Sequence, residues 1–408
     1  MRVSTNTMYD QGVQSMLKQQ EALFKLQQQI SVGKRIVTPS DDPVAAARAH
    51  EVSQAASINS QYAENRDKAK ASLGLVETNL QGATTIIQNV RSIAVAAGNP
   101  ILSESDRRVM ATELKGRLEE LLGLANSADS EGNFLFSGYQ ARIQPFVKSA
   151  GEIQYAGDQG QRLTQVTSSR QIAVSDSGSN IFERVMDGNG VFTTSANTGN
   201  SGTGIIGVGS VADPTNLTGD SYEINFHVTQ DPLTLKDIIT YDAINTTTSS
   251  TISSGNTFTD GDTIAFDGLQ LDIKGKPGDG DQFKVEPSAQ QSIFKTIDNL
   301  INVLETTTND QSGKTNLTNS LNTAMQNLDQ GLDNVLSIRA SVGVKLQEID
   351  ALNSIGEDNA LQYDQALSRL QDLDYAKALS DFARQQGLLE AAQQSFIRIS
   401  GLSLFNRL

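Results

Sequence analysis

Few stretches of this 408-residue chain have residue types and spacing that could support chemistry, and the most conspicuous is a glycine-rich segment. Residues 202–207 match the pattern GxGxxG, in which a glycine turn holds the phosphates of a dinucleotide. Such a turn needs a strand before it and a helix after it. Polar residues 197–201 precede the segment, and Asp213-Pro214 follows too soon for a helix. We therefore interpret residues 202–207 as a flexible loop.

Three other short motifs resemble phosphate or cation sites without meeting their requirements. Residues 313–315, Gly-Lys-Thr, resemble the end of a P-loop, but Thr308 stands where the upstream glycine is required. Residues 260–262 and 279–281 both read Asp-Gly-Asp, and neither has the spacing and terminal Glu of an EF-hand loop. We interpret both as turns between strands.

The composition removes most remaining routes to catalysis. The chain has no cysteine, so disulfides, thiolate metal ligands and a cysteine nucleophile are all excluded. Its two histidines, His50 and His227, lie far apart in the sequence, and we interpret each as structural. No grouping of Ser, His and Asp is visible. The sequence therefore predicts no enzymatic activity, no cofactor and no metal site.

Charge and hydropathy argue against two further classes of partner. The chain has 32 basic and 47 acidic residues, a net charge of −15, which disfavours binding to nucleic acid. Its longest apolar run, residues 93–97, is far shorter than the about 18 residues that a membrane span requires. No apolar segment follows the first residues, so we expect neither membrane insertion nor a cleaved secretory signal peptide.

The two ends of the chain carry apolar seams that predict pairing helices. In both terminal segments large apolar side chains recur at intervals of seven residues. This spacing places them along one line of an α-helix. A single helix cannot bury such a narrow seam by itself, so each end is the natural partner of the other. We expect the eight seam residues to form an assembly interface in a coiled-coil root: Tyr9, Met16, Leu23, Ile30, Tyr375, Phe382, Leu389 and Phe396.

Long helices are predicted inside these ends. Asp41, Asp42 and Pro43 form a helix-cap motif, because aspartate is a good N-cap and proline fits the first turn. A helix from Pro43 to about residue 97 would be about 80 Å long. A second helix follows from Ser103, which forms a capping-box pair with Asp106.

The middle of the chain changes to a strand pattern and then back to helix. Residues 133–136 are predicted as a strand, and runs 153–155 and 163–166 as a hairpin around a turn at 157–160. The composition shifts to Gly, Ser, Thr and Asp between residues 176 and 286, with short alternating runs at 222–228, 263–266, 269–273 and 282–285. Helix returns after Pro287, with Ser288 and Gln291 as a capping pair, and a longer apolar stripe runs from Leu317 to Ile349.

These elements predict a mainly α protein with an inserted β domain. The expected fold is elongated: terminal helices paired in a coiled-coil root, a rod of long helices and a central β-rich domain. We place the root at residues 1–40 plus 360–408, the rod with its β-hairpin at 41–175 plus 287–359, and the inserted domain at 176–286.

Two motifs at the ends resemble a known family. Residues 31–37, Ser-Val-Gly-Lys-Arg-Ile-Val, with Ser-Asp-Asp-Pro at 40–43, resemble the N-terminal hallmark of bacterial flagellins and their relatives. Residues 368–370 and 374–376 likewise resemble the C-terminal signature of that superfamily. Details at 39–43, 124–126, 132–138, 278–283 and 403–406 are similar to the branch that joins the flagellar hook to the filament. Arg407 departs from the aromatic residue often found near that position.

The resemblance implies a structural role without enzymatic activity. It implies flagellin-like terminal helices, export through the flagellar type III apparatus without cleavage, and an extracellular location at the hook-filament junction. The implied partners are other copies of the chain in a ring, a neighbouring hook-associated protein, flagellin on the filament side, and a cytoplasmic export chaperone. Flagellin itself, the bulk filament subunit, is the alternative. A cytoplasmic coiled-coil scaffold is a further alternative, but it would leave the β insertion without a role.

Overall fold

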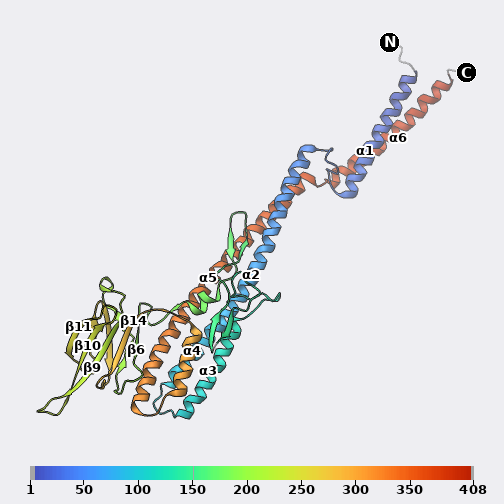
Figure 1. Ribbon diagram of the computed structural model, residues 1–408. Coiled ribbons are helices and arrows are strands. Elements are labelled where there is room, and N and C mark those ends of the chain that lie inside the picture. Colours follow the sequence, from blue (N-terminus) through green and yellow to red (C-terminus); the bar gives the residue numbers. More distant parts are fainter. Residues whose placement is uncertain (1–4, 150, 406–408) are drawn as a thin grey trace. The chain divides into compact units, whose positions relative to one another are not determined.

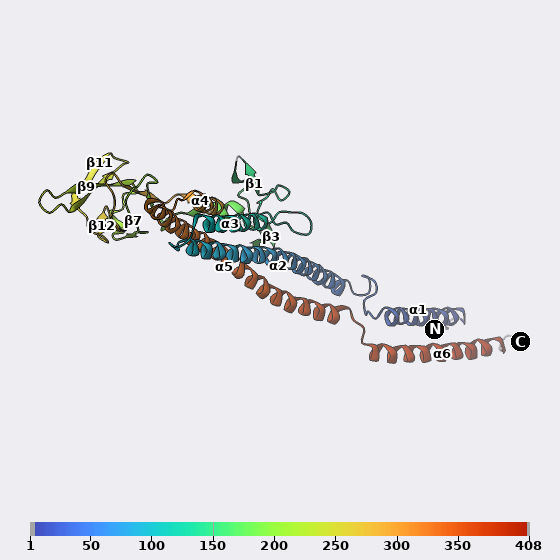
Figure 2. The same ribbon diagram turned by 90° about the horizontal axis from the view of Figure 1, so that it is seen from below.

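The computed structural model describes residues 5–149 and 151–405, and these form two compact units (Figures 1 and 2). The terminal unit takes in the described residues up to Asn65 and those from Ala351 onward. The central unit spans Arg66–Asp350. The chain is mainly helical with a β-rich region in its middle, as the sequence predicts. The three-part division into root, rod and inserted domain stays a prediction.

The terminal unit is built on two helices that lie side by side, α1 (Thr5–Val32) and α6 (Tyr375–Phe405). Helix α1 ends at Gly33, whose φ of 73° is the left-handed conformation that closes a helix, and whose N–H donates to the Gln29 carbonyl. Helix α6 begins after Asp374, whose carboxylate accepts the Lys377 N–H at 3.1 Å. Both boundaries follow from residues with a clear capping role.

Four helices shape the central unit: α2 (Pro43–Ala97), α3 (Glu104–Ala125), α4 (Ile293–Thr306) and α5 (Gln311–Gln371). Helices α2 and α5 also contribute residues to the terminal unit. The predicted capping box of Ser103 and Asp106 is present at the start of α3. The apolar stripes are buried, with Leu80, Ile87 and Val90 of α2 at the centre of the helical core. Arg339 interrupts the stripe of α5 and pairs there with Glu77 of α2 at 2.7 Å.

The predicted cap of the fourth helix is wrong. Ser288 and Gln291 do not cap it; the helix starts after Ser292, whose hydroxyl accepts the Phe294 N–H. Gln291 instead belongs to β15 (Gln290–Gln291), which pairs with β5 (Val185–Met186), and the Ser288 hydroxyl donates to the Asp187 carbonyl. Because this pairing holds the chain extended, the helix cannot begin before residue 292.

Two predictions about the strands before the insertion are also wrong. Residues 133–136 form turns with one isolated bridge between Ala128 and Phe134 rather than a strand. The runs at 153–155 and 163–166 do not pair with each other. They belong to separate hairpins, β1 (Phe146–Ser149) with β2 (Glu152–Tyr155), and β3 (Leu163–Gln165) with β4 (Gln171–Ala173). The turn at 157–160 is tied to the preceding loop instead, because Asp158 accepts the Tyr139 and Gln140 N–H groups.

The inserted β region contains two antiparallel sheets around a shared core. The larger sheet has the order β11-β10-β9-β14-β6. Its strands are β6 (Phe192–Ala196), β9 (Tyr222–Gln230), β10 (Asp237–Asn245), β11 (Ser250–Thr257) and β14 (Gln282–Pro287). The smaller sheet has β7 (Ile205–Ile206), β8 (Ser210–Val211), β12 (Thr263–Phe266) and β13 (Leu269–Lys274). Phe226, Phe283 and Ile273 are fully buried between them. The runs predicted at 222–228, 263–266, 269–273 and 282–285 are β9, β12, β13 and β14.

Short helical turns complete the region: a π-helical segment at Ser179–Glu183 and a 3-10 turn at Pro214–Asn216. Within the described residues, no helix is long and apolar enough to cross a membrane.

Candidate assembly surface

The two sequence signatures, far apart in the chain, contact each other in the terminal unit. The Arg35 N–H donates to the Gln371 carbonyl at 2.7 Å, and the Leu373 N–H donates to the Gly33 carbonyl at 3.0 Å. These bonds flank an antiparallel bridge between Lys34 and Asp372. We call residues 33–42 and 370–374 the terminal joint. It fastens the turn after α1 to the turn before α6.

Arg35 makes the side-chain contacts at the centre of the joint. Its guanidinium donates to the Leu370 carbonyl at 2.9 Å and lies 3.4 Å from the Asp42 carboxylate. Its own carbonyl accepts the side-chain amide of Gln29 at 2.6 Å. One side chain therefore connects the end of α5 to the start of α2, while its backbone is held by α1.

The predicted cap motif divides into two roles. Asp42 caps α2, because its carboxylate accepts the Ala45 N–H at 3.0 Å and Pro43 occupies the first helical position. Asp41 does not cap the helix. Its carboxylate accepts the N–H groups of Thr38 at 2.9 Å and Val37 at 3.0 Å. It also pairs with Lys25 of α1 at 2.7 Å. Asp41 thus closes the loop between α1 and α2.

Both carboxylates are stabilised in their charged form by these contacts. The Lys25 ammonium, followed by the Thr38 N–H, holds the pKa of Asp41 far below its usual range. The Ala45 N–H, followed by the Arg35 guanidinium, lowers the pKa of Asp42. The joint therefore stays ionised over the whole neutral range.

Gly33 is required at the joint for two reasons. Its positive φ disfavours any side chain, and an added Cβ would lie 2.8 Å from the hydroxyl of Tyr375. That hydroxyl lies 3.4 Å from the Ile30 carbonyl. The first seam residue of α6 therefore packs against the last turn of α1.

Four of the eight predicted seam residues make contacts between α1 and α6, Tyr9 with Phe396 and Ile30 with Tyr375. The rings of Tyr9 and Phe396 have centroids 4.8 Å apart, and Gly12 leaves room for Phe396. Tyr9 and Tyr375 are about half exposed, and the other six are partly buried: Met16, Leu23, Ile30, Phe382, Leu389 and Phe396. The seam is thus used, at least in part, inside one chain. Its role between chains stays a prediction.

A second set of apolar side chains on the same two helices escaped the sequence analysis. Leu17 and Phe24 of α1 are 58% and 61% exposed, and Leu388 and Ile397 of α6 are also exposed. Each lies next to a seam residue in the sequence. Leu17 and Phe24 are seven residues apart, so the same spacing rule could have identified them. We call these four residues the outer apolar set.

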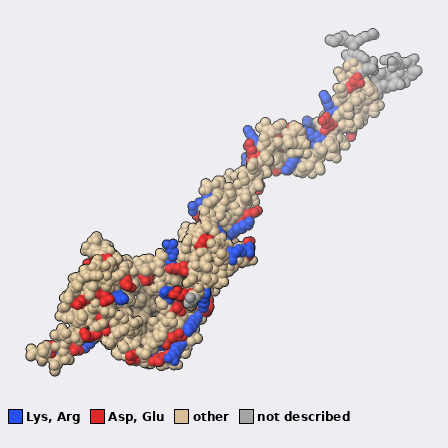
Figure 3. Space-filling view, viewed as in Figure 1, with Lys and Arg blue, Asp and Glu red and all other residues tan. Residues whose placement is uncertain are grey.

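Charge does not single out a surface. Figure 3 shows Lys and Arg interspersed with Asp and Glu over the face in view, without an extended patch of one sign. Among the described residues, no three His, Cys, Asp or Glu side chains lie close enough together to hold a metal ion.

The glycine-rich segment is structural, but it is not simply a loop. Residues 205–206 form β7, which pairs with β13. The buried carboxylate of Asp281 accepts the Ser201 N–H at 2.7 Å and the Gly202 N–H at 3.1 Å. The N–H group of Gly202 is therefore occupied by the chain's own aspartate, and those of Thr203 and Gly207 donate to backbone carbonyls. The prediction that 279–281 is a turn is confirmed, with Gly280 at a φ of 81° between β13 and β14.

A polar strip on α5, also missed from the sequence, holds the inserted region. Asn319 donates to the Gly204 carbonyl and accepts the Ile206 N–H, both at 3.0 Å. Asn327 accepts the Gly188 N–H at 2.9 Å, and Asn334 donates to the Ile181 carbonyl at 2.9 Å. The three asparagines lie eight and seven residues apart in a helix that also carries an apolar stripe, and this spacing is a signal that could have indicated such a contact.

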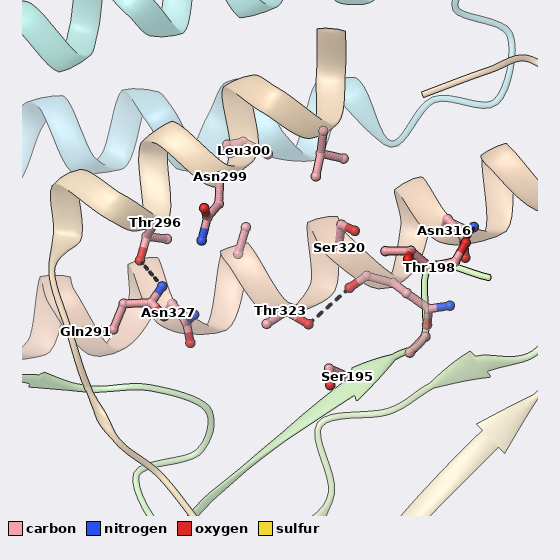
Figure 4. A pocket seen from close by; sticks show the side chains of 14 residues that line it. Ser195, Thr198, Gln291, Thr296, Asn299, Leu300, Asn316, Ser320, Thr323 and Asn327 are labelled. Atoms are coloured by element: carbon pink, nitrogen blue, oxygen red, sulfur yellow. Dashed lines mark hydrogen bonds between the residues drawn. The ribbon is translucent and has the colours of Figure 1, made fainter. Parts of the chain in front are cut away.

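A small cavity of about 210 Å³ lies beside this strip, between α4, α5 and β6 (Figure 4). Thr296 and Asn299 of α4 point toward α5 in this view. The polar groups of its lining are neutral amides and hydroxyls, and the rest of the lining is apolar. With no titratable group in it, this lining offers no acid, base or nucleophile of altered pKa for catalysis.

The chain is similar to known flagellar proteins, in agreement with the contact between its two terminal signatures. The family model of the bacterial flagellin N-terminal helical region matches residues 3–141. The chain is 30% identical over 406 residues to flagellar hook-associated protein 3 of Escherichia coli (strain K12), covering 99% of both chains.

The chain is also similar to solved structures of flagellar proteins. FlgL of Xanthomonas campestris is 31% identical, with a TM-score of 0.71, over 78% of this chain and 99% of that one. The flagellar junction protein FlgL of Legionella pneumophila is 28% identical, with a TM-score of 0.72, over 80% of this chain and 100% of that one.

Proposed function

This chain belongs to the family of flagellar hook-associated protein 3, structural proteins of the bacterial flagellum, and we propose that it joins hook to filament through a surface built on α1 and α6. The observation that carries the proposal is the outer apolar set. The seam is partly covered within the chain, whereas Leu17 and Phe24 remain more than half exposed. Apolar side chains left exposed on a paired helical element are the contacts that a neighbouring subunit would cover.

The terminal joint supports this arrangement by fixing both helices. Its backbone ladder and the Arg35 contacts hold the turn after α1 to the turn before α6. The two helices therefore present their seam and their outer apolar set together. A subunit contact made by a fixed pair of helices loses less entropy on assembly than one made by two separate segments.

We also propose specific partners, which the family and this surface support. Other copies of the chain form a ring, a neighbouring hook-associated protein lies on the hook side, and flagellin lies on the filament side. We further propose that the chain leaves the cell through the flagellar type III apparatus without cleavage. A cytoplasmic chaperone covers α6 and its apolar side chains before export.

A charge placed on the outer apolar set tests the proposal. In the Phe24→Asp variant, a carboxylate occupies the subunit contact, and loss of a hot-spot aromatic costs about 2 kcal/mol or more per contact. We expect hooks without filaments and flagellin in the medium, by electron microscopy and immunoblotting. The variant's thermal unfolding should match that of the wild type, because Phe24 is 61% exposed.

The matched control is Leu233→Asp, which charges an exposed leucine on the β9–β10 hairpin and should leave swimming unchanged. Secretion of both variants is measured separately. Full filaments on cells that secrete Phe24→Asp normally would rule out this surface. Long filaments formed by the purified wild-type chain alone would favour the flagellin alternative.

A further inference from the structure

The loop that follows the turns of residues 133–136 presents an exposed aromatic side chain. Tyr139 is 66% exposed, and Arg142 and Ile143 in the same loop are also exposed. We call residues 138–143 the Tyr139 loop. It belongs to the central unit and is separate from the terminal helices.

The backbone of this loop is held in place by one carboxylate. Asp158 accepts the Tyr139 N–H at 2.9 Å, the Gln140 N–H at 3.0 Å and the Gly160 N–H at 2.7 Å. These N–H groups lower the pKa of Asp158, and the Tyr139 N–H has the largest effect. The carboxylate therefore stays charged at neutral pH. The Phe134 N–H also donates to the Ala141 carbonyl at 2.7 Å. The loop is therefore fixed at both sides of Tyr139.

Two glycines make room for this arrangement. A Cβ at Gly160 would lie 2.1 Å from the Tyr139 ring, so the ring rests directly against the backbone of that residue. Gly138 has a φ of 75°, and a Cβ there would lie 2.2 Å from the Asp158 carboxylate. The ring is thus supported on one side and open on the other.

A supported but exposed tyrosine is suited to binding. Tyrosine and arginine are enriched among the residues that dominate protein interfaces, and a side chain already held in place loses little entropy when a partner binds. If Tyr139 served only to cover Gly160, most of its surface would be buried instead of exposed. The geometry favours a contact with something outside the chain.

We propose that the Tyr139 loop is a contact for a second copy of this chain. The proposal rests on the proposed function, because a ring places copies side by side. Charge supports the choice of occupant: the loop exposes the guanidinium of Arg142, the neighbouring Asp158 carboxylate is taken up by three backbone N–H groups, and the whole chain carries a net charge of −15. Lys148 pairs with Glu119, and Arg142 forms no ion pair within the described residues. The loop thus offers an aromatic ring and a free cation to an acidic neighbour.

Photo-crosslinking in cells tests this contact. p-Benzoylphenylalanine is placed at position 139 of the full chain, and in a second strain at position 17. We expect illumination of position 139 to give a product of twice the 43.8 kDa chain mass, identified by mass spectrometry as two copies of this chain. Absence of that product, or a product with another protein only, overturns the inference. A two-copy product from position 17 alone would leave the proposed function standing while this inference fails.

Substitutions separate an interface role from a covering role. Tyr139→Ser should leave the thermal unfolding temperature unchanged and reduce the amount of the chain retained on purified hooks at least tenfold. Tyr139→Phe should retain it, because the ring is kept. Leu233→Ser, which removes a similarly exposed apolar side chain elsewhere, is the matched control and should have no effect. A lower unfolding temperature for Tyr139→Ser with normal retention would show that the ring only covers Gly160.

Discussion

Asp42 and Asp374 both cap the N-terminus of a helix, α2 in one case and α6 in the other. Each lies one residue before a helix and accepts the N–H of the third helical residue, Ala45 in one case and Lys377 in the other. Each also lies within two residues of a contact of the terminal joint, so the caps fix where α2 and α6 begin relative to that joint. The sequence identified Asp42 as a cap, because aspartate before proline is a strong local signal. Asp374 has no proline after it, and the sequence shows it only within the resemblance to the flagellin C-terminal signature.

Asp281 shows what local sequence cannot reveal. Its turn was predicted from Asp-Gly-Asp, but its partners, Ser201 and Gly202, are far away in the chain. The carboxylate is almost fully buried and is satisfied by backbone N–H groups, including that of Gly278 at 2.7 Å. Contacts of this kind depend on which strands become neighbours, and no spacing rule contains that information.

The polar strip of α5 gives a prediction at the scale of one residue. Asn319 is 5% exposed and holds both Ile206 and Gly204. Asn319→Ala leaves a buried N–H and a buried carbonyl without a partner, so we expect the free energy of unfolding to fall by about 1–3 kcal/mol. Urea unfolding of the purified chain measures this loss.

The matched control is Asn322→Ala, three positions along α5, since no hydrogen bond of the Asn322 amide is described and its side chain is less buried. That variant should stay close to the wild type. Equal stability of the two variants would show that the Asn319 bonds are replaced by water at little cost.

At the scale of elements, the sequence predicted helices well and some strands poorly. Three-four spacing of apolar residues indicated α2, α3 and α5, because a long amphipathic stripe repeats the same signal many times. The strands β10 and β11 were missed. Strand β11, Ser250–Thr257, has five Ser and Thr among its eight residues, lies at an edge of its sheet and has no buried residue, so alternation is weak. The apolar residues 134–136 favour a strand in the sequence, but Leu135 and Phe136 are buried in turns that precede the Tyr139 loop.

The candidate surface was predicted in part for a similar reason. The seam residues repeat every seven positions and were found, whereas the outer apolar set repeats only once on α1. Which of two neighbouring residues faces the partner helix depends on how α1 and α6 pack together. Met16 is partly buried and Leu17 is exposed, and the sequence does not distinguish them.

Helices α1 and α6 are expected to open more easily than the central unit. The buried apolar residues of the described terminal unit are three alanines, Ala45, Ala49 and Ala378, whereas the central unit buries many leucines and phenylalanines. We therefore expect limited proteolysis of the isolated chain to remove residues within 1–40 and 360–408 first. Mass spectrometry of a time course identifies the fragments. Equal resistance along the whole chain, or first cleavage inside the central unit, would contradict this expectation.

At the scale of the molecule, the inserted β region has the features of a separate module. Its aromatic core, with Phe226, Phe258 and Phe283, is made by its own strands. Amides of α5 hold it by bonding to its backbone groups. These polar contacts are regained with water when the module is removed. Residues 179–183 also make apolar contacts with the helical part, since the ring of Phe182 lies 5.7 Å from the rings of Phe146 and Phe294, so their removal is expected to lower the stability of that part. The assembly surface that we propose lies on other elements.

Deleting the insertion tests whether joining and the β region are independent. A chain without residues 178–284, closed by a short Gly/Ser link, keeps α1, α6, the terminal joint and the Tyr139 loop. We expect it to be exported and to support filaments, with swimming close to that of the wild type. Swimming assays, immunoblots of the medium and electron microscopy of whole cells measure the three steps. A shorter deletion of the hairpin tip, residues 231–236, controls for effects of shortening the chain on export. If the larger deletion is exported at the same level but leaves hooks without filaments, then the β region takes part in joining and the terminal helices are not sufficient for it.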